Sequence, residues 1–158
     1  MPTITTFLTY NNQAEEAVNL YLSIFENGKI TSTTRMPEGG PGPKGSVLSM
    51  TFELFGQTFY ALNGGPTFTF TQGFSLFVSC DTQAEIDRYW TKLTEGGGKE
   101  IQCGWLVDKF GVSWQIVPKV LLPMISDSDP AKAGRAMQAM MKMTKLDIAT
   151  LKRAYDGD

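Results

Sequence analysis

Few side chains in this sequence are of the types that carry chemistry, and histidine is missing altogether. Among 158 residues there is no histidine, which is the commonest metal ligand and the usual acid or base near neutral pH. Ser-His-Asp and Cys-His catalysis within one chain are therefore excluded, and so is a histidine-based zinc or iron site. A metal site built only from carboxylates remains open. We expect no metal and no other cofactor.

The remaining reactive candidates are two cysteines and two carboxylates. Cys80 and Cys103 lie in strand-like segments, where a buried structural thiol is the expected role. A nucleophilic cysteine would need a lowered pKa, and no histidine is present to lower it. Asp108 opens the turn D-K-F-G, because Asp first and Gly fourth are typical of a type I turn. Glu53 lies in a strand, where we expect it to face solvent, with an inward carboxylate as the alternative.

The composition indicates a globular chain of ordinary size. It is 42% hydrophobic and 19% charged, with a net charge of −2, so a basic surface for nucleic acid is not expected. No run of about 18 apolar residues suggests a membrane span. Two cysteines cannot form a disulfide framework. We therefore expect a cytoplasmic protein with no nucleic-acid or membrane partner.

The first half of the chain predicts a strand, a helix and three further strands. The helix has Ala17, Tyr21 and Ile24 at helical spacing, with Asn11 or Asn12 as the expected cap. The stretch PEGGPGPKG can be neither helix nor strand and predicts a loop. The expected elements are a strand over 1–10, a helix over 11–28, a strand over 29–36, the loop over 37–45 and a hairpin over 46–63.

The second half repeats this order without the long loop. Its expected elements are a strand over 73–80, a helix over 81–98 capped by Asp81 or Thr82, a strand over 99–102 and a hairpin over 103–118. Beyond residue 120 the pattern becomes helical. Asp129-Pro130 is a good helix start, and Thr144 or Asp147 could cap a further helix.

Sequence matches support an internal duplication. Gln13-Ala14-Glu15 matches Gln83-Ala84-Glu85 seventy residues later, and the apolar helix stripes agree within one residue. The predicted fold is α+β, with tandem β-α-β-β-β modules and a C-terminal helical extension. We expect a single domain over 1–158, made of module one (1–66), module two (67–120) and the extension (121–158).

Three strings resemble the PhnB-like branch of the vicinal oxygen chelate superfamily, which includes glyoxalase I and the bleomycin-resistance proteins. They are FLTYNNQAEEAVNLYLSIFENGKI, CDTQAEIDRYWTKLTEGG and CGWLVDKFGVSWQIVP. This branch is often labelled 3-demethylubiquinone-9 3-methyltransferase-like. The resemblance implies that the two modules form a curved cup of mixed sheets, and that the protein is a homodimer.

The resemblance also implies where metal ligands would lie in the metal-dependent members. These positions carry Thr6, Tyr60, Ser75 and Gln115 here, which are not the imidazole or carboxylate groups that a tight divalent site needs. We therefore expect a metal-free protein with degenerate ligand positions. The usual methyltransferase signature, a glycine-rich strand-to-helix turn, is missing too.

The cup implied by the resemblance could still hold an organic molecule. Its expected lining is Tyr60, Trp105, Ser113 and Gln115, a mixture of aromatic and polar groups that suits stacking and hydrogen bonding. Trp105 could instead be a core residue, whereas Trp114 should point away from Gln115 and pack under a helix. The leading hypothesis is a metal-free binder of an unknown small organic ligand. The alternatives are an enzyme on the same fold, either lyase- or isomerase-like or the methyltransferase of the label, and a structural or partner-binding homodimer.

Overall fold

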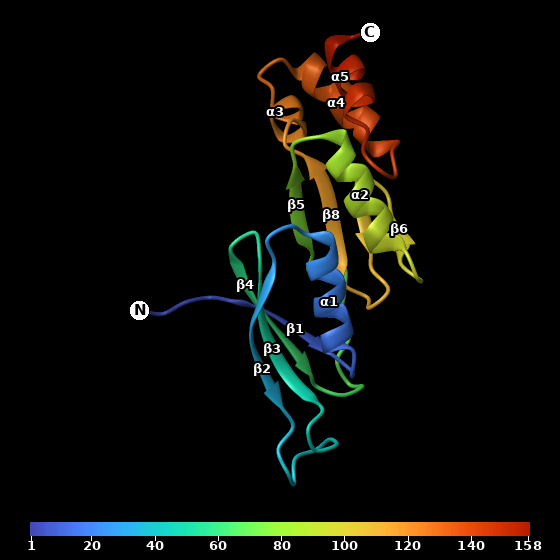
Figure 1. Cartoon of the computed structure of the whole chain (residues 1–158). Coiled ribbons are helices and arrows are strands. Elements are labelled where there is room, and N and C mark those ends of the chain that lie inside the picture. The colour runs from blue at the N-terminus through green and yellow to red at the C-terminus, as the bar shows by residue number, and fades with distance from the viewer. The chain divides into compact units, whose positions relative to one another are not determined.

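The computed structural model describes residues 1–158, which form two compact units (Figure 1). The first unit is Met1–Thr69 and the second is Phe70–Asp158. Each unit contains a four-stranded sheet, and the second also contains the C-terminal helices. The predicted α+β fold with two β-α-β-β-β modules is confirmed. No helix of this chain is long and apolar enough to cross a membrane.

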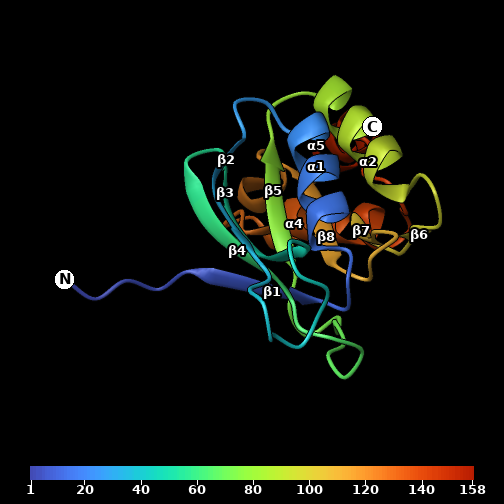
Figure 2. The same ribbon diagram turned by 60° about the horizontal axis from the view of Figure 1, so that its bottom comes forward.

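The first unit is a mixed sheet with one helix. Its strand order is β1-β4-β3-β2, in which β1 runs parallel to β4 and the other pairs are antiparallel. The residues before β1 belong to no helix or strand, and in Figure 2 they extend away from the sheet. The elements are β1 (Thr6–Tyr10), α1 (Ala14–Ile24), β2 (Lys29–Arg35), β3 (Val47–Leu54) and β4 (Gln57–Asn63).

Alternation along the strands decides which face of this sheet α1 covers. Leu8, Phe52 and Phe59 are buried, and they alternate with partly exposed residues, so one face packs against the helix while the other stays open. Tyr10 and Tyr21 join β1 to α1 through a 3.0 Å hydrogen bond between their hydroxyls. The open face of the sheet therefore carries the side chains that remain available for binding.

The start of α1 differs from the expected cap. Neither Asn11 nor Asn12 caps the helix, since the residue at the cap position is Gln13 and its side chain makes no capping bond. Instead the Ala14 amide donates to Oδ1 of Asn63, at 2.9 Å. Asn63 ends β4, which pairs with β1, so the sheet supplies the cap from 49 residues away along the chain.

The second unit repeats the arrangement with the strand order β5-β8-β7-β6. Again the first strand pairs parallel with the last, and the others are antiparallel. Thr82 caps the helix through a complete capping box with Glu85, one of the two predicted caps. The elements are β5 (Leu76–Cys80), α2 (Gln83–Thr94), β6 (Lys99–Glu100), β7 (Trp105–Val107) and β8 (Ser113–Pro118).

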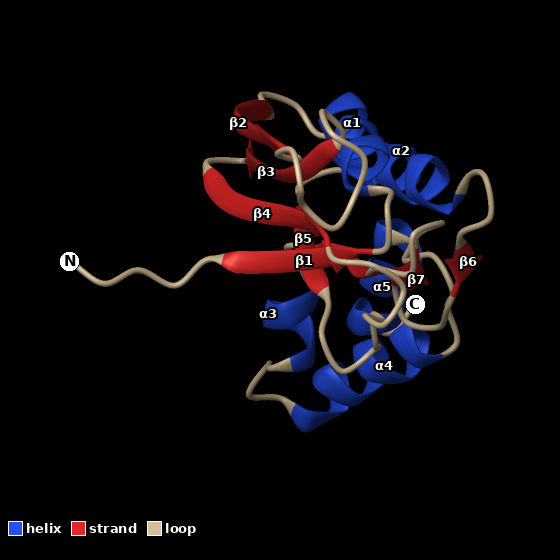
Figure 3. Ribbon diagram, turned by 90° about the horizontal axis from the view of Figure 1, so that it is seen from below, coloured by secondary structure: helices blue, strands red, loops and turns tan.

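Three helices, α3 (Leu121–Ile125), α4 (Pro130–Met141) and α5 (Ile148–Asp156), follow β8. Asp129 and Asp147 cap the last two with their side chains. Figure 3 shows α2 on one side of this unit's strands and α3 and α4 on the other. Val117, Leu121, Leu146 and Leu151 form the buried cluster that joins these helices to β8. The extension is thus part of the second unit's core.

Candidate ligand-binding site

The open face of the first sheet presents two aromatic side chains. The strand register places Phe7 beside Tyr60, and Tyr60 beside Thr51. The rings of Phe7 and Tyr60 meet edge to face, with centroids 5.9 Å apart. Phe7 is 55% exposed and Tyr60 is 38% exposed. Tyr60, a predicted lining residue, is therefore available on the open face of its own unit.

The open face of the second sheet carries an equivalent set of neighbouring side chains, with different functional groups. Gln115 lies between Phe77 and Trp105 in the register. Its Nε2 atom donates to Oγ of Ser75 at 3.0 Å. Two of the positions that the superfamily pattern singles out, Ser75 and Gln115, are therefore joined directly. Phe77 follows Phe7 by seventy residues and is similarly exposed, at 58%.

A pocket of about 340 Å³ lies in the second unit, and it brings together Trp105 and Ser113 from the predicted set. Its size falls in the lower part of the range for small-molecule sites. Most of the wall is apolar or amide-bearing, and none of it is acidic or basic. The wall consists of Gln72, Ile101, Gln102, Cys103, Trp105, Leu106, Val107 and Ser113.

Ser113 gives this pocket its most informative atom. The residue is 2% exposed, and its Oγ atom is buried without a hydrogen-bond partner. Nearly all buried polar atoms in proteins are paired, because leaving one unsatisfied costs about 1–3 kcal/mol. The hydroxyl therefore has an unused hydrogen-bonding capacity, and it lies just beneath the surface of the cavity wall.

Three of the wall residues, Ile101, Gln102 and Cys103, lie in the turn between β6 and β7. Strand β6 ends at Glu100, and residues 101–104 then bulge before β7 begins. Cys103 and Gly104 both adopt left-handed backbone conformations, with φ of 62° and 82°. At Gly104 an added Cβ would lie 2.9 Å from Cδ1 of Leu146 and 3.0 Å from the Ile116 carbonyl oxygen. The bulge thus needs glycine at this position.

The residues present do not fit a divalent metal. Tyr60, Ser75 and Gln115 offer a phenol, a hydroxyl and an amide, and no three His, Cys, Asp or Glu side chains lie close enough to share an ion. Thr6 alternates with Phe7 along β1 and shares its face with buried Leu8. The open-face neighbour of Tyr60 is therefore Phe7 and not Thr6. Hard divalent cations prefer carboxylates and carbonyls, and this donor set offers one amide carbonyl.

The other chemical candidates have structural environments. Asp108 is 2% exposed; its Oδ1 atom accepts from the Phe110 and Val112 amides, and its Oδ2 atom accepts from Nε1 of Trp114 at 2.9 Å. The predicted turn former thus also anchors a tryptophan, and that tryptophan is buried, as expected. Burial, with the nearby Glu85 carboxylate, raises the pKa of the Cys80 thiol to about 12.

Glu53 lies on the open face of the first sheet. Its carboxylate pairs with the Lys29 ammonium at 3.3 Å, and its side chain is 30% exposed. The pair lies across neighbouring strands, since Lys29 and Glu53 are register partners. The geometry gives Glu53 a partner and no catalytic neighbour.

Six residues of the pocket were not in the lining predicted from the sequence: Gln72, Ile101, Gln102, Cys103, Leu106 and Val107. The strand expected over 99–102 is only two residues long, so residues 101 and 102 belong to the bulge. A positive φ at a non-glycine residue such as Cys103 has no reliable sequence signature. The Cys-Gly pair before Trp105 was the available signal for a break in the strand.

The comparisons with known proteins agree with this architecture. The family model described as 3-demethylubiquinone-9 3-methyltransferase matches residues 2–117. A putative 3-demethylubiquinone-9 3-methyltransferase, a PhnB protein from Bacillus cereus, is 41% identical; the match covers 74% of this chain and 99% of that one, with a TM-score of 0.69. No curated protein matches the chain.

Two more distant structures share the fold. A protein from Pseudomonas aeruginosa is 21% identical, with 75% of this chain and 98% of that one covered and a TM-score of 0.61. The fosfomycin resistance protein FosX from Mesorhizobium loti is 10% identical, with 73% and 90% covered and a TM-score of 0.54. The family match stops at residue 117, before α3, α4 and α5.

Proposed function

Because the chain belongs to the 3-demethylubiquinone-9 3-methyltransferase (PhnB-like) family and shares its fold with a fosfomycin resistance protein, we propose that it binds a small organic molecule. The ligand lies in the pocket of the second unit, against Trp105 and Ser113. Gln115 and its partner Ser75 lie on the same open face of the sheet, outside the wall of the pocket. Tyr60 belongs to the first unit and is not part of this pocket.

The observation that carries the proposal is the unsatisfied hydroxyl of Ser113. A polar atom buried at the wall of a cavity is stabilised when a ligand supplies its missing hydrogen bond. Trp105, Ile101 and Val107 supply apolar surface around it. An apolar pocket with a few polar groups is the usual form of a small-molecule site.

Binding in this proposal uses no metal, because the degenerate positions lack the ligands that one requires. Methyl transfer, which the family description names, is not part of the proposal. The two turns that lead from strand to helix, residues 11–13 and 81–82, contain no glycine, whereas nucleotide-type cofactors are commonly held at a glycine-rich turn of this kind. A homodimer remains part of the proposal, since the fold family is often dimeric.

Native mass spectrometry of protein purified without chelators tests the organic ligand, the absence of metal and the homodimer together. We expect a dimer without metal that retains an organic mass, or that binds one from a compound library. A stoichiometric metal ion would overturn the metal-free binding proposal.

Substituting Ser113 by alanine separates binding from folding. In the ligand-free protein Ser113→Ala should leave the melting temperature unchanged or raise it, because it removes an unsatisfied buried hydroxyl. The stabilisation by the library ligand should fall. Ser79→Ala is the matched control, since Ser79 is an exposed serine of the same sheet. Equal ligand-induced shifts in both variants would contradict the proposal.

A further inference from the structure

We infer that the ligand of this pocket is an uncharged molecule with a flat ring and a single hydrogen-bonding group. The inference rests on the proposed function and names the class of molecule that the wall selects. Three features of the wall carry it: the charge of its side chains, the indole ring and the position of the one unsatisfied polar atom.

The wall offers no charge to balance a charged ligand. Its polar side chains are the two amides of Gln72 and Gln102 and the hydroxyl of Ser113, and its remaining thiol belongs to Cys103. An ion transferred into such surroundings loses hydration without gaining a counter-charge, at a cost of several kcal/mol. The pocket therefore discriminates against carboxylates and ammonium groups.

Charged residues of β6 lie outside the wall. Lys99 is exposed and is the register partner of Val107, which places it beside the rim on the same face of the sheet. Glu100 is already engaged, because its carboxylate accepts a 2.6 Å hydrogen bond from Nε1 of Trp90. An anionic ligand would therefore have to reach beyond the wall to Lys99 to find a counter-charge.

The shape of the wall favours a ring. Trp105 is half-buried and lies with Val107 on the face of β7 opposite to buried Leu106. Its indole can therefore pack against a ligand together with Val107. Aromatic pairs contribute about 0.5–1.5 kcal/mol beyond their buried area. The Ser113 hydroxyl can donate or accept one hydrogen bond, which suits a hydroxyl, carbonyl or amide on the ring.

Three probes with one ring system test the class. We would titrate 2-naphthol, 2-naphthoate and 2-naphthylmethylammonium into the protein at pH 7 by calorimetry, in wild type, Ser113→Ala and the control Ser79→Ala. We expect 2-naphthol to bind at least tenfold more tightly than either ion. Ser113→Ala should weaken 2-naphthol about fivefold, the size of one neutral hydrogen bond, and Ser79→Ala should not.

The titrations separate the class of ligand from the location of the pocket. If an ion binds as tightly as 2-naphthol and Ser113→Ala weakens it, the pocket is correct and the inferred class is wrong. If none of the probes binds, the class is also wrong, and the retained mass in native spectrometry decides the proposed function separately. Equal effects of Ser113→Ala and Ser79→Ala on 2-naphthol would overturn the role of the Ser113 hydroxyl.

A second observation supports a role for the C-terminal extension in the same pocket. The backbone amides of Cys103 and Gly104 donate to the carbonyls of Met143 and Thr144, each at 2.8 Å. Cys103 is a wall residue, so the segment between α4 and α5 is hydrogen-bonded directly to the wall of the pocket. We infer that this segment fixes the pocket's shape, although it lies beyond the part of the chain that matches the family.

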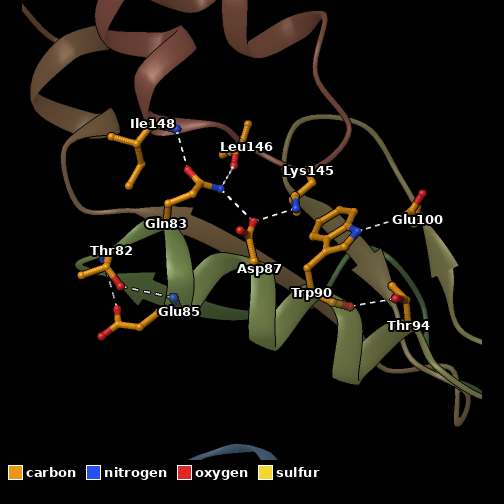
Figure 4. Close-up of polar contacts among 10 residues, drawn as sticks. All are labelled: Thr82, Gln83, Glu85, Asp87, Trp90, Thr94, Glu100, Lys145, Leu146 and Ile148. Carbon is orange, nitrogen blue, oxygen red and sulfur yellow. Dashed lines mark hydrogen bonds and ion pairs between the residues drawn. The ribbon is translucent and has the colours of Figure 1, made fainter.

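The segment is itself fastened to α2 (Figure 4). Gln83 uses both ends of its amide: Nε2 donates to the Leu146 carbonyl at 3.0 Å, and Oε1 accepts from the Ile148 amide at 2.8 Å. Asp87 pairs with Lys145 at 2.6 Å. The segment between α4 and α5 is therefore bonded both to α2 and to the wall of the pocket.

Thiol labelling tests this support without any ligand. The Cys103 thiolate attacks the disulfide of 5,5′-dithiobis(2-nitrobenzoate), forms a mixed disulfide and releases 2-nitro-5-thiobenzoate, which is followed by absorbance. Gln83→Ala loosens the segment, and we expect Cys103 to react at least fivefold faster. Thr91→Ala, at an exposed site on the same helix, should leave the rate unchanged.

Cys80 serves as an internal control because it is buried and its thiol has a raised pKa. Faster labelling of Cys103 with Cys80 still protected supports the inference. An unchanged Cys103 rate, or simultaneous labelling of both thiols through global unfolding, would overturn it. Lys145→Ala provides a second variant and should produce a smaller increase, since its ion pair is partly exposed.

Discussion

At the scale of single residues, the two cysteines show how environment separates similar groups. Cys80 is 1% exposed on the helix-facing side of β5, whereas Cys103 is half-buried in the pocket wall. Their sequence contexts are both strand-like, and we expected buried structural thiols in both. The difference comes from the left-handed backbone at Cys103, which turns the chain out of the sheet.

The raised pKa of Cys80 gives stability a dependence on alkaline pH. Burial raises the pKa from 9.0 to about 12, so between these values the folded state binds more protons than the unfolded state. The contribution to stability is complete below pH 9 and is lost as the pH rises through 12. Urea unfolding of wild type and Cys80→Ala from pH 8 to 11 should show a steeper fall for wild type. Parallel pH profiles would contradict this account, and Cys103→Ala is the control.

Gly104 is the residue on which the bulge depends most directly. Gly104→Ala should lower the free energy of unfolding by about 3 kcal/mol, because it combines a left-handed backbone with a steric clash. Gly111 has a similar φ of 95°, but the nearest atoms to an added Cβ lie at 3.8 Å. Gly111→Ala should therefore cost only about 1 kcal/mol of backbone strain. Equal losses in urea unfolding would show that the clash with Leu146 is absent.

At the scale of elements, helix caps made by neighbouring residues could be predicted, whereas those made by residues distant in the sequence could not. Thr82, Asp129 and Asp147 cap the helices that follow them, because a cap is decided by neighbouring residues. The cap of α1 comes from Asn63, and no pattern near residue 14 points to it. In the site, strand alternation predicts a shared face for Ser113 and Gln115, whereas the bulge at 101–104 depends on contacts with residues 143–146.

The capping box of α2 gives a quantitative test at this scale. Thr82→Ala removes the side-chain acceptor of the Glu85 amide and should lower the free energy of unfolding by about 1 kcal/mol. Thr82→Ser retains a hydroxyl and should restore most of the loss. Chemical denaturation followed by circular dichroism measures both variants. A Thr82→Ser variant as unstable as Thr82→Ala would indicate that the methyl group, and not the cap, matters.

At the scale of the whole molecule, the internal repeat could be predicted from the sequence, whereas the packing of the extension could not. The repeat is visible in the sequence, and it reappears as two sheets with the same strand order. The extension was predicted as helical, but its attachment could not be, because Val117, Leu146 and Leu151 come from separate segments. Burial of such a cluster is a property of the folded chain and has no local periodicity.

Removing residues 119–158 should therefore destabilise the second unit. The truncation exposes Val117 and leaves the amides of Cys103 and Gly104 without their acceptors. We expect the melting temperature measured by scanning calorimetry to fall by several degrees or more. A chain lacking only residues 157–158 is the control. An unchanged melting temperature in the long truncation would show that the extension is an independent appendage.

A crystal structure of the protein grown with 2-naphthol would show directly whether the pocket of the second unit binds an organic ring. We predict that the ring packs against Trp105, with its hydroxyl within hydrogen-bonding distance of Oγ of Ser113, and that no metal lies at Ser75 or Gln115. Binding in this pocket would be contradicted by a pocket closed by its own side chains with the Ser113 hydroxyl paired inside the protein, or by the ring bound elsewhere.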